Sequence, residues 1–185
     1  CLDRDQSSPL YRCRPLWAWC GLACGCVFLC TALGKQALAS DATQVSATRN
    51  FYGVLRIVRR ENETLGSQVA MLNGRIVHGT QCTADGLRSL PTAYYGPNSG
   101  FGVAMRMHPL RKSGPADARG LRVGIVGLGA GVMNVYGRAG DYFRYYEINP
   151  DVVRLAREHF TFLSDCPART DIVVGDARVC LEREL

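Results

Sequence analysis

Three glycines and one glutamate are the residues whose type and spacing indicate chemistry in this sequence. Gly127, Gly129 and Gly131 lie in VGIVGLGAG, and Glu147 follows Gly127 by 20 positions, at the end of the next apolar run. Glycine lets a backbone turn sharply and approach a ligand closely. An acidic residue at the end of the second strand of a nucleotide-binding unit holds ribose hydroxyls. Together the two features predict a nucleotide site.

The spacing of the glycines indicates which nucleotide is bound. The pattern is G-x-G-x-G, and Val132 stands where the dinucleotide pattern G-x-G-x-x-G has glycine or alanine. This disfavours NAD and favours an adenosyl sulfonium ligand, which has no pyrophosphate to place at a helix N-terminus. Asp176 follows the third apolar run, and the carboxyl edge of an open α/β sheet is where ligands bind.

Alternating strands and helices are expected to position these residues. The predicted strands are Leu121–Val126, Phe143–Ile148 and Asp171–Val174. One helix is expected from about Gly131, and a second over DVVRLAREHF, opened by Asn149 and Pro150. This alternation predicts an α/β fold with a doubly wound, Rossmann-like parallel sheet of the S-adenosylmethionine-dependent methyltransferase type over residues 120–185.

A small antiparallel β unit is expected before that sheet, over residues 50–112. Its strand candidates are Phe51–Val58, Gln68–Leu72 and Arg75–His78, with Asn73 and Gly74 as a tight hairpin turn. PTAYYGPNSGFG is typical of a loop followed by the start of a helix. The small polar residues of 35–49 indicate a linker.

An uncharged run near the start of the chain predicts a transmembrane helix over residues 16–34. LWAWCGLACGCVFLCTAL gives roughly 27 Å of helix, close to the thickness of a bilayer core. The alternative is a signal peptide, since Ala37, Leu38 and Ala39 form an A-x-A cleavage pattern. The run is longer than the apolar region of a signal peptide, which favours a retained helix. Residues 1–15 are then a cytoplasmic or inter-helix segment.

Composition excludes two classes of function. The net charge of +6 comes from scattered arginines without a basic stripe interleaved with aromatic residues, so nucleic acid is not an expected partner. Six of the nine cysteines lie in the first thirty residues, but without CxxC spacing and with no histidine before His78, so no metal site is expected. The absence of an initiator methionine and the end at Leu185 within a helical pattern predict a fragment.

Seven segments in this order resemble spermidine synthases, specifically the membrane-fused kind in which transmembrane helices precede the synthase domain. The similarity covers about Arg49 to Glu184. The segments are RNFYGVLRI, LNGRIVHGTQ, YYGPNSGFG, VGIVGLGAG, YYEINPDVV, FTFLSDC and VVGDAR. The resemblance implies transfer of an aminopropyl group from decarboxylated S-adenosylmethionine to a polyamine. The amine nitrogen attacks the carbon next to the sulfonium.

The resemblance also implies roles for individual residues. Gly127, Gly129 and Gly131 would form the adenosyl loop, and Glu147 would hold the ribose hydroxyls. No cofactor would be bound permanently, because decarboxylated S-adenosylmethionine or S-adenosylmethionine acts as co-substrate.

Other residues would complete the pocket in the same family pattern. Asp176 and Ala177 would contact the adenine, and Gln81 and Tyr95 are candidates for the substrate pocket. The partners implied are a small polyamine acceptor, membrane lipid and a second copy of the chain in a homodimer.

The sequence departs from the family pattern in three places. Asn73 stands in LNG where soluble synthases have LDG, and Tyr94 with Tyr95 occupies the region of a YHE-like motif. The catalytic aspartate of the family lies on the strand after the one ending near Asp176, and this strand is absent from the 185 residues. A general base must lie within hydrogen-bond reach of its proton, so the catalytic residue stays unknown and is expected beyond Leu185.

Two other functions fit the same motifs. An S-adenosylmethionine-dependent methyltransferase shares the glycine turn and the acidic residue. A membrane-linked nucleotide-binding module would keep the pocket without performing transfer. The expected location is the inner or plasma membrane with the synthase-like domain in the cytoplasm, where the adenosyl donor is found, although the local arginines favour the opposite orientation.

Overall fold

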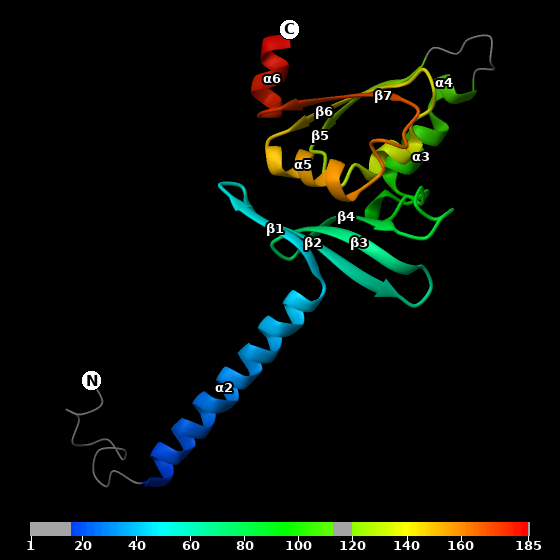
Figure 1. Ribbon diagram of the computed structural model, residues 1–185. Coiled ribbons are helices and arrows are strands. Elements are labelled where there is room, and N and C mark those ends of the chain that lie inside the picture. Colours follow the sequence, from blue (N-terminus) through cyan, green and yellow to red (C-terminus); the bar gives the residue numbers. More distant parts are fainter. Residues whose placement is uncertain (1–15, 113–119, 185) are drawn as a thin grey trace. The chain divides into compact units, whose positions relative to one another are not determined.

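The chain consists of an apolar helix and an α/β unit (Figure 1). This computed structural model describes residues 16–112 and 120–184. The chain divides into two compact units, Cys1–Thr43 and Gln44–Leu185. Helix α2 (Leu16–Ala42) belongs to the first unit, and the strands belong to the second.

Helix α2 contains a segment, Trp17–Gln36, that is long and apolar enough to cross a membrane. Twenty residues at about 1.5 Å each span about 30 Å, the thickness of a bilayer core. It is the one such helix within residues 16–112 and 120–184, and none of this segment is buried in protein. A signal sequence near the N-terminus meets the same criteria of length and composition, so both interpretations from the sequence stay open. The helix continues to Ala42, into the expected linker.

Four antiparallel strands in the order β1-β2-β3-β4 begin the second unit. They are β1 (Gln44–Asn50), β2 (Gly53–Asn62), β3 (Gly66–Asn73) and β4 (Ile76–Cys82). The expected turn between the last two strands is present, and Gly74 there has a φ of 58°. The three predicted strands of the small β unit are thus confirmed, each with somewhat different ends.

Strand β1 lies in the segment that the sequence assigned to a linker. Its residues alternate between half-buried and exposed, and it pairs with β2, for example Ala47 with Arg56 and Arg49 with Val54. Small polar residues have the composition of a linker. The backbone hydrogen bonds to β2 stabilise the strand, and these depend on pairing rather than on local composition.

The two faces of the antiparallel sheet have different partners. Leu55, Ile57 and Met71 are at most 1% exposed and belong to the main core, which they share with the parallel sheet. Val58 and Leu72 lie on the other face in a small cluster of their own. The first face therefore packs the antiparallel sheet against the elements of the parallel sheet.

A short helical segment connects the two sheets. It contains η1 (Ala93–Tyr95), α3 (Gly100–Met107) and α4 (Pro109–Lys112). Ser99 caps α3, since its hydroxyl accepts the N–H of Gly102 at 3.1 Å. Gly102 is required by space as well, because a Cβ there would lie 2.5 Å from the carbonyl oxygen of Gly96. The predicted loop and helix start are confirmed.

Three parallel strands in the order β5-β6-β7 form the second sheet. The elements are β5 (Arg122–Val126), η3 (Val132–Tyr136), β6 (Tyr142–Glu147), α5 (Pro150–His159), β7 (Arg169–Val174) and α6 (Ala177–Glu184). The helix expected from about Gly131 is a short 3-10 helix. Pro150 is the first residue of α5 and Asn149 is its cap, as predicted.

Alternation along β6 places its side chains on two faces of the parallel sheet. Phe143 and Tyr145 are fully buried in the core that includes Leu155 of α5. On the other face, Arg144 and the Tyr146 hydroxyl bond the Glu184 carboxylate of α6. Helices α5 and α6 thus lie on opposite sides of the sheet (Figure 1). The predicted fold class is confirmed: an α/β protein with an antiparallel sheet and a parallel sheet, and one apolar helix near the N-terminus.

Candidate functional site

The glycine turn and Glu147 meet at the carboxyl edge of the parallel sheet. The N–H of Gly127, the residue after β5, donates to the carbonyl oxygen of Tyr146 at 2.8 Å. The N–H of Gly175, the residue after β7, donates to the carbonyl oxygen of Glu147 at 2.9 Å. These bonds fix the start of the glycine turn and the end of β7 on either side of the end of β6.

The glycines of the turn have left-handed backbones but serve different purposes. Gly127, Gly129 and Gly131 have φ values of 85°, 57° and 81°. A Cβ on Gly127 would meet no atom within 4 Å, whereas one on Gly129 would lie 2.6 Å from the carbonyl oxygen of His78. A Cβ on Gly131 would lie 3.3 Å from Leu163. Gly127 therefore leaves open space, and Gly129 permits close packing against β4.

Glu147 presents a carboxylate held by two backbone donors. The side chain is 7% exposed. Oε2 accepts the N–H of Leu128 at 2.8 Å, and Oε1 accepts the N–H of Asn149 at 2.9 Å. No cation of the described residues forms an ion pair with it. Each oxygen keeps a free lone pair, so the group can accept further hydrogen bonds from a ligand.

A cavity of about 430 Å³ opens at this edge of the sheet. The glycine turn and β6 supply Gly127, Gly129 and Glu147, while the antiparallel sheet supplies Asn73 and His78 among the other lining residues. The cavity thus lies between the two sheets of the second unit, with glycine on one wall and a buried carboxylate in the lining.

Tyr95 also lines this cavity and is half-buried. Burial, and then a hydrogen bond with Tyr94, raise the pKa of Tyr95 well above its usual value. The hydroxyl therefore stays protonated at neutral pH and can donate a hydrogen bond. The Tyr95 carbonyl oxygen accepts the Tyr136 hydroxyl at 2.6 Å, which fixes the position of its backbone.

Four of the residues proposed from the sequence lie outside the cavity lining. Gly131 packs against Leu163, as described above. Asp176 is exposed, and its Oδ1 accepts the N–H of Val179 at 3.1 Å at the start of α6, where Ala177 is the first residue. Contact of Asp176 and Ala177 with an adenine therefore stays a prediction.

Gln81, the fourth of these residues, uses its amide within the fold. Its Nε2 donates to the Arg88 carbonyl oxygen at 3.1 Å and to the Thr161 hydroxyl at 2.9 Å, and its Oε1 accepts the Thr161 N–H at 3.0 Å. The side chain is 5% exposed. It connects β4 with the segment after α5, and a role in a substrate pocket stays a prediction.

The cavity contains residues that the sequence did not indicate. Tyr52 comes from the turn between β1 and β2, and Ile148 and Asn149 follow Glu147 directly. Asn149 was recognised only as the residue that opens a helix. Proximity to Glu147 was the one available signal for Ile148 and Asn149, and Tyr52 had none, because it reaches the cavity through tertiary packing.

A second buried carboxylate, Asp141, lies at the opposite end of β6. It accepts Arg111 Nη1 at 3.1 Å and Nη2 at 2.5 Å, the Leu121 N–H at 2.8 Å and the Arg138 N–H at 2.7 Å. Burial acts to raise the pKa of Asp141, but the hydrogen bonds from Arg111, Arg138 and Leu121 outweigh it and lower that pKa. All of its hydrogen-bonding capacity is used inside the fold.

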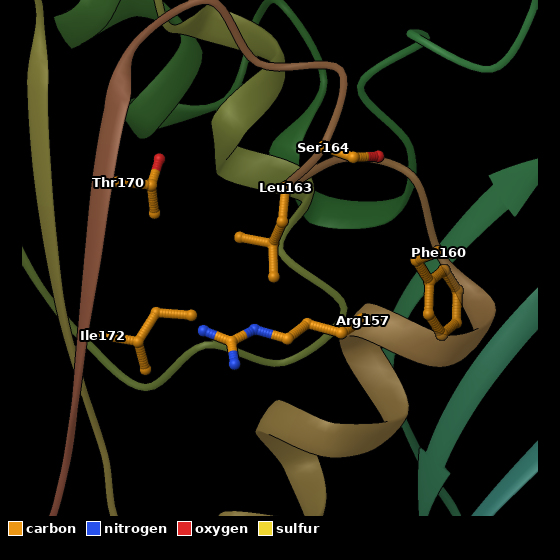
Figure 2. Close-up of a pocket in the computed structure, with 6 residues that line it drawn as sticks. All are labelled: Arg157, Phe160, Leu163, Ser164, Thr170 and Ile172. Atoms are coloured by element: carbon orange, nitrogen blue, oxygen red, sulfur yellow. The ribbon is translucent and has the colours of Figure 1, made fainter.

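A smaller cavity of about 320 Å³ lies beside β7, and Figure 2 shows the Arg157 guanidinium directed toward this strand. Its lining residues are Arg157, Phe160, Leu163, Ser164, Thr170 and Ile172. None of the residues proposed from the sequence lines it. The cavity at Glu147 is therefore the candidate site.

Several solved structures are similar to this chain. No family model matches the chain, and no curated protein matches it. A spermidine synthase from Thermotoga maritima has 19% identity and a TM-score of 0.48, with 76% of this chain and 43% of that chain covered. A spermidine synthase in complex with the transition-state analogue AdoDATO has 19% identity and a TM-score of 0.46, with the same coverage of 76% and 43%. The chain spans less than half the length of these proteins. At this identity the similarity concerns the fold alone.

Proposed function

We propose that this chain binds an adenosyl sulfonium nucleotide at Glu147 and serves aminopropyl transfer from decarboxylated S-adenosylmethionine to a polyamine. The observation that carries the proposal is the Glu147 carboxylate, held by two backbone N–H groups beside an open glycine turn. Ribose hydroxyls donate to the free lone pairs of the carboxylate. The bare Cα of Gly127 leaves room for the ligand.

Two features favour aminopropyl transfer over methyl transfer. The ordered motifs resemble those of spermidine synthases, and an antiparallel sheet adds Asn73 and His78 to the lining of the cavity. Residues from this second sheet support a site for a second substrate beside the adenosyl donor. The exposed apolar side chains of Val126 and Ile148 offer a surface on which the adenine ring of the ligand can lie.

The proposed reaction forms one bond and breaks one. The neutral amine nitrogen of the acceptor attacks the carbon next to the sulfonium, the C–S bond breaks, and the sulfur leaves as a neutral thioether. The new ammonium then loses a proton to a base. Among the described residues that line the cavity, Glu147 is the one carboxylate, and it is engaged by backbone donors. Its role is therefore binding, and the base is not assigned.

We also propose that α2 anchors the protein in a membrane with the catalytic unit in the cytoplasm, where the adenosyl donor is found. The apolar segment Trp17–Gln36 supports an anchor. A homodimer and a contact with lipid remain parts of this proposal.

The test is equilibrium binding of decarboxylated S-adenosylmethionine, S-adenosylmethionine and NAD to the detergent-solubilised chain. The decarboxylated donor is expected to bind most tightly. Glu147→Gln is expected to weaken its binding by about 1.5 to 3 kcal/mol, the contribution of a hydrogen bond to a charged group. Tighter binding of S-adenosylmethionine would favour a methyltransferase, and absence of binding by both adenosyl compounds would overturn the proposal.

The control for this variant is Glu182→Gln, which removes a carboxylate on an exposed part of α6. It is expected to leave binding unchanged. Thermal unfolding of both variants separates a loss of binding from a loss of folded protein, because the Glu147 oxygens also hold the backbone of Leu128 and Asn149.

A further inference from the structure

The side-chain amide of Asn149 has a fixed orientation. Its Oδ1 accepts the N–H of Asp151 at 3.0 Å as the cap of α5, and it accepts Asn50 Nδ2 at 2.7 Å. Both partners are donors, so the oxygen and not the nitrogen of the amide must face them. The NH₂ group therefore points away from these two donors.

That NH₂ group is buried without an acceptor among the described residues. Asn149 is 3% exposed and lines the cavity that contains Gly127 and Glu147. The other such buried nitrogen of the described residues, Arg111 Nε, belongs to a guanidinium that is paired with Asp141 and does not line this cavity. An unpaired buried donor is costly, which indicates that a ligand supplies its acceptor.

Glu147 and Asn149 form a complementary pair in the cavity lining. The Asn149 backbone N–H donates to Glu147 Oε1 at 2.9 Å, so the acceptor carboxylate and the donor amide are close together. A hydroxyl group both donates and accepts hydrogen bonds. One ribose hydroxyl can therefore donate to Glu147 while its oxygen accepts from Asn149, or the two groups can bind neighbouring hydroxyls.

We infer that Asn149 is a specificity-determining residue that donates to one ribose hydroxyl oxygen of the adenosyl ligand and so selects ribose over deoxyribose. The inference rests on the proposed function, because it requires an adenosyl ligand in this cavity. Asn149 contacts the sugar and has no part in the transfer itself.

Two variants remove the NH₂ group and keep an oxygen that can cap the helix. Asn149→Ser retains a neutral oxygen that can accept the Asp151 N–H, and Asn149→Asp keeps the shape with two acceptor oxygens. The matched control is Asn62→Ser. Asn62 Oδ1 likewise accepts backbone N–H groups, from Thr64 and Leu65 at 2.9 Å, in an exposed turn away from the cavity.

The experiment measures binding of 5′-methylthioadenosine, its 2′-deoxy form and its 3′-deoxy form by calorimetry to the detergent-solubilised chain. This probe is uncharged, so the added charge of Asn149→Asp does not act on a sulfonium. Each deoxy form is expected to bind the wild type more weakly. Both Asn149 variants are expected to bind the parent compound about five- to tenfold more weakly, the effect of one hydrogen bond.

The decisive readout is selectivity. In the Asn149 variants the penalty for one of the two deoxy forms is expected to shrink by the contribution of the lost hydrogen bond, while the penalty for the other remains unchanged. A merely structural role of Asn149 would weaken all three ligands equally and leave both penalties intact, which would overturn the inference. Unchanged affinity would do the same. If the wild type binds none of the three compounds, the proposed function itself fails, and this outcome is distinct from a failure of Asn149 alone.

Discussion

The two ends of β6 each contain a buried carboxylate, and the two are held in different ways. Asp141, before the strand, pairs with Arg111 and accepts two backbone N–H groups as well. Glu147, at the end of the strand, accepts two backbone N–H groups, pairs with no described cation and lines a cavity. Burial alone therefore does not distinguish the two carboxylates, whereas unused hydrogen-bonding capacity does, because Asp141 has none left and each Glu147 oxygen keeps a free lone pair.

The largest effect on stability is expected at Asp141, the carboxylate whose hydrogen-bonding capacity is fully used. Asp141→Asn removes the charge that neutralises Arg111, whose side chain is 7% exposed. Breaking such a buried pair costs about 3 to 5 kcal/mol in the free energy of unfolding. Urea unfolding of the wild type and the variant measures this loss. A loss below about 1 kcal/mol, comparable to that of the exposed pair formed by Arg178 and Glu182, would show that the two ends of β6 do not differ as described.

A smaller loss of stability is expected from Gly129→Ala in the turn above Glu147. The new Cβ would lie 2.6 Å from the His78 carbonyl oxygen and would hold a left-handed backbone. Overpacking and backbone strain together cost about 2 to 4 kcal/mol. Thermal unfolding followed by circular dichroism measures the change. An unfolding temperature equal to that of the wild type would mean that β4 does not pack closely on the glycine turn.

Gly127→Ala is expected to separate binding from stability. The new Cβ has open space, so the loss of stability is only the strain of a left-handed alanine, about 1 kcal/mol. The methyl group enters the space of the ligand and is expected to weaken adenosyl binding at least about tenfold. Gly66→Ala is the matched control, because Gly66 has a φ of 68°, has the same open surroundings and does not line the cavity. Equal binding by the two variants would remove Gly127 from the site.

The smallest effect is expected in the dependence of stability on pH. The pKa of Asp141 is lower in the folded chain than its ordinary value of about 3.9, so its ionisation stabilises the fold above that value. This contribution is lost as the pH falls through the lower pKa of the folded state. The difference in unfolding free energy between the wild type and Asp141→Asn should therefore be constant near neutral pH and shrink below about pH 4. A difference that stayed constant down to pH 2 would contradict a lowered pKa of Asp141 in the folded chain.

Local patterns were sufficient to predict the main elements around the parallel sheet. The glycine turn, the strand ending at Glu147 and the helix opened by Asn149 and Pro150 depend on neighbouring residues, and the structure has all three. Strand β1 could not be predicted, because pairing with β2 and not its own composition stabilises it.

The prediction of site residues was also limited by contacts between distant parts of the sequence. Gln81 was selected from a motif, yet its amide is bonded to Thr161, 80 positions away. The free NH₂ group of Asn149 depends on Asn50, which lies 99 positions earlier and fixes the orientation of the amide. Contacts over such separations have no signature in a single sequence.

Asp141 also joins α4 to the residue before β5. Its carboxylate bonds the Arg111 side chain of α4 and the backbone N–H of Leu121. Replacing this one carboxylate would therefore release α4 and the start of β5 together. Backbone amides of both elements are expected to exchange hydrogen faster in Asp141→Asn than in the wild type.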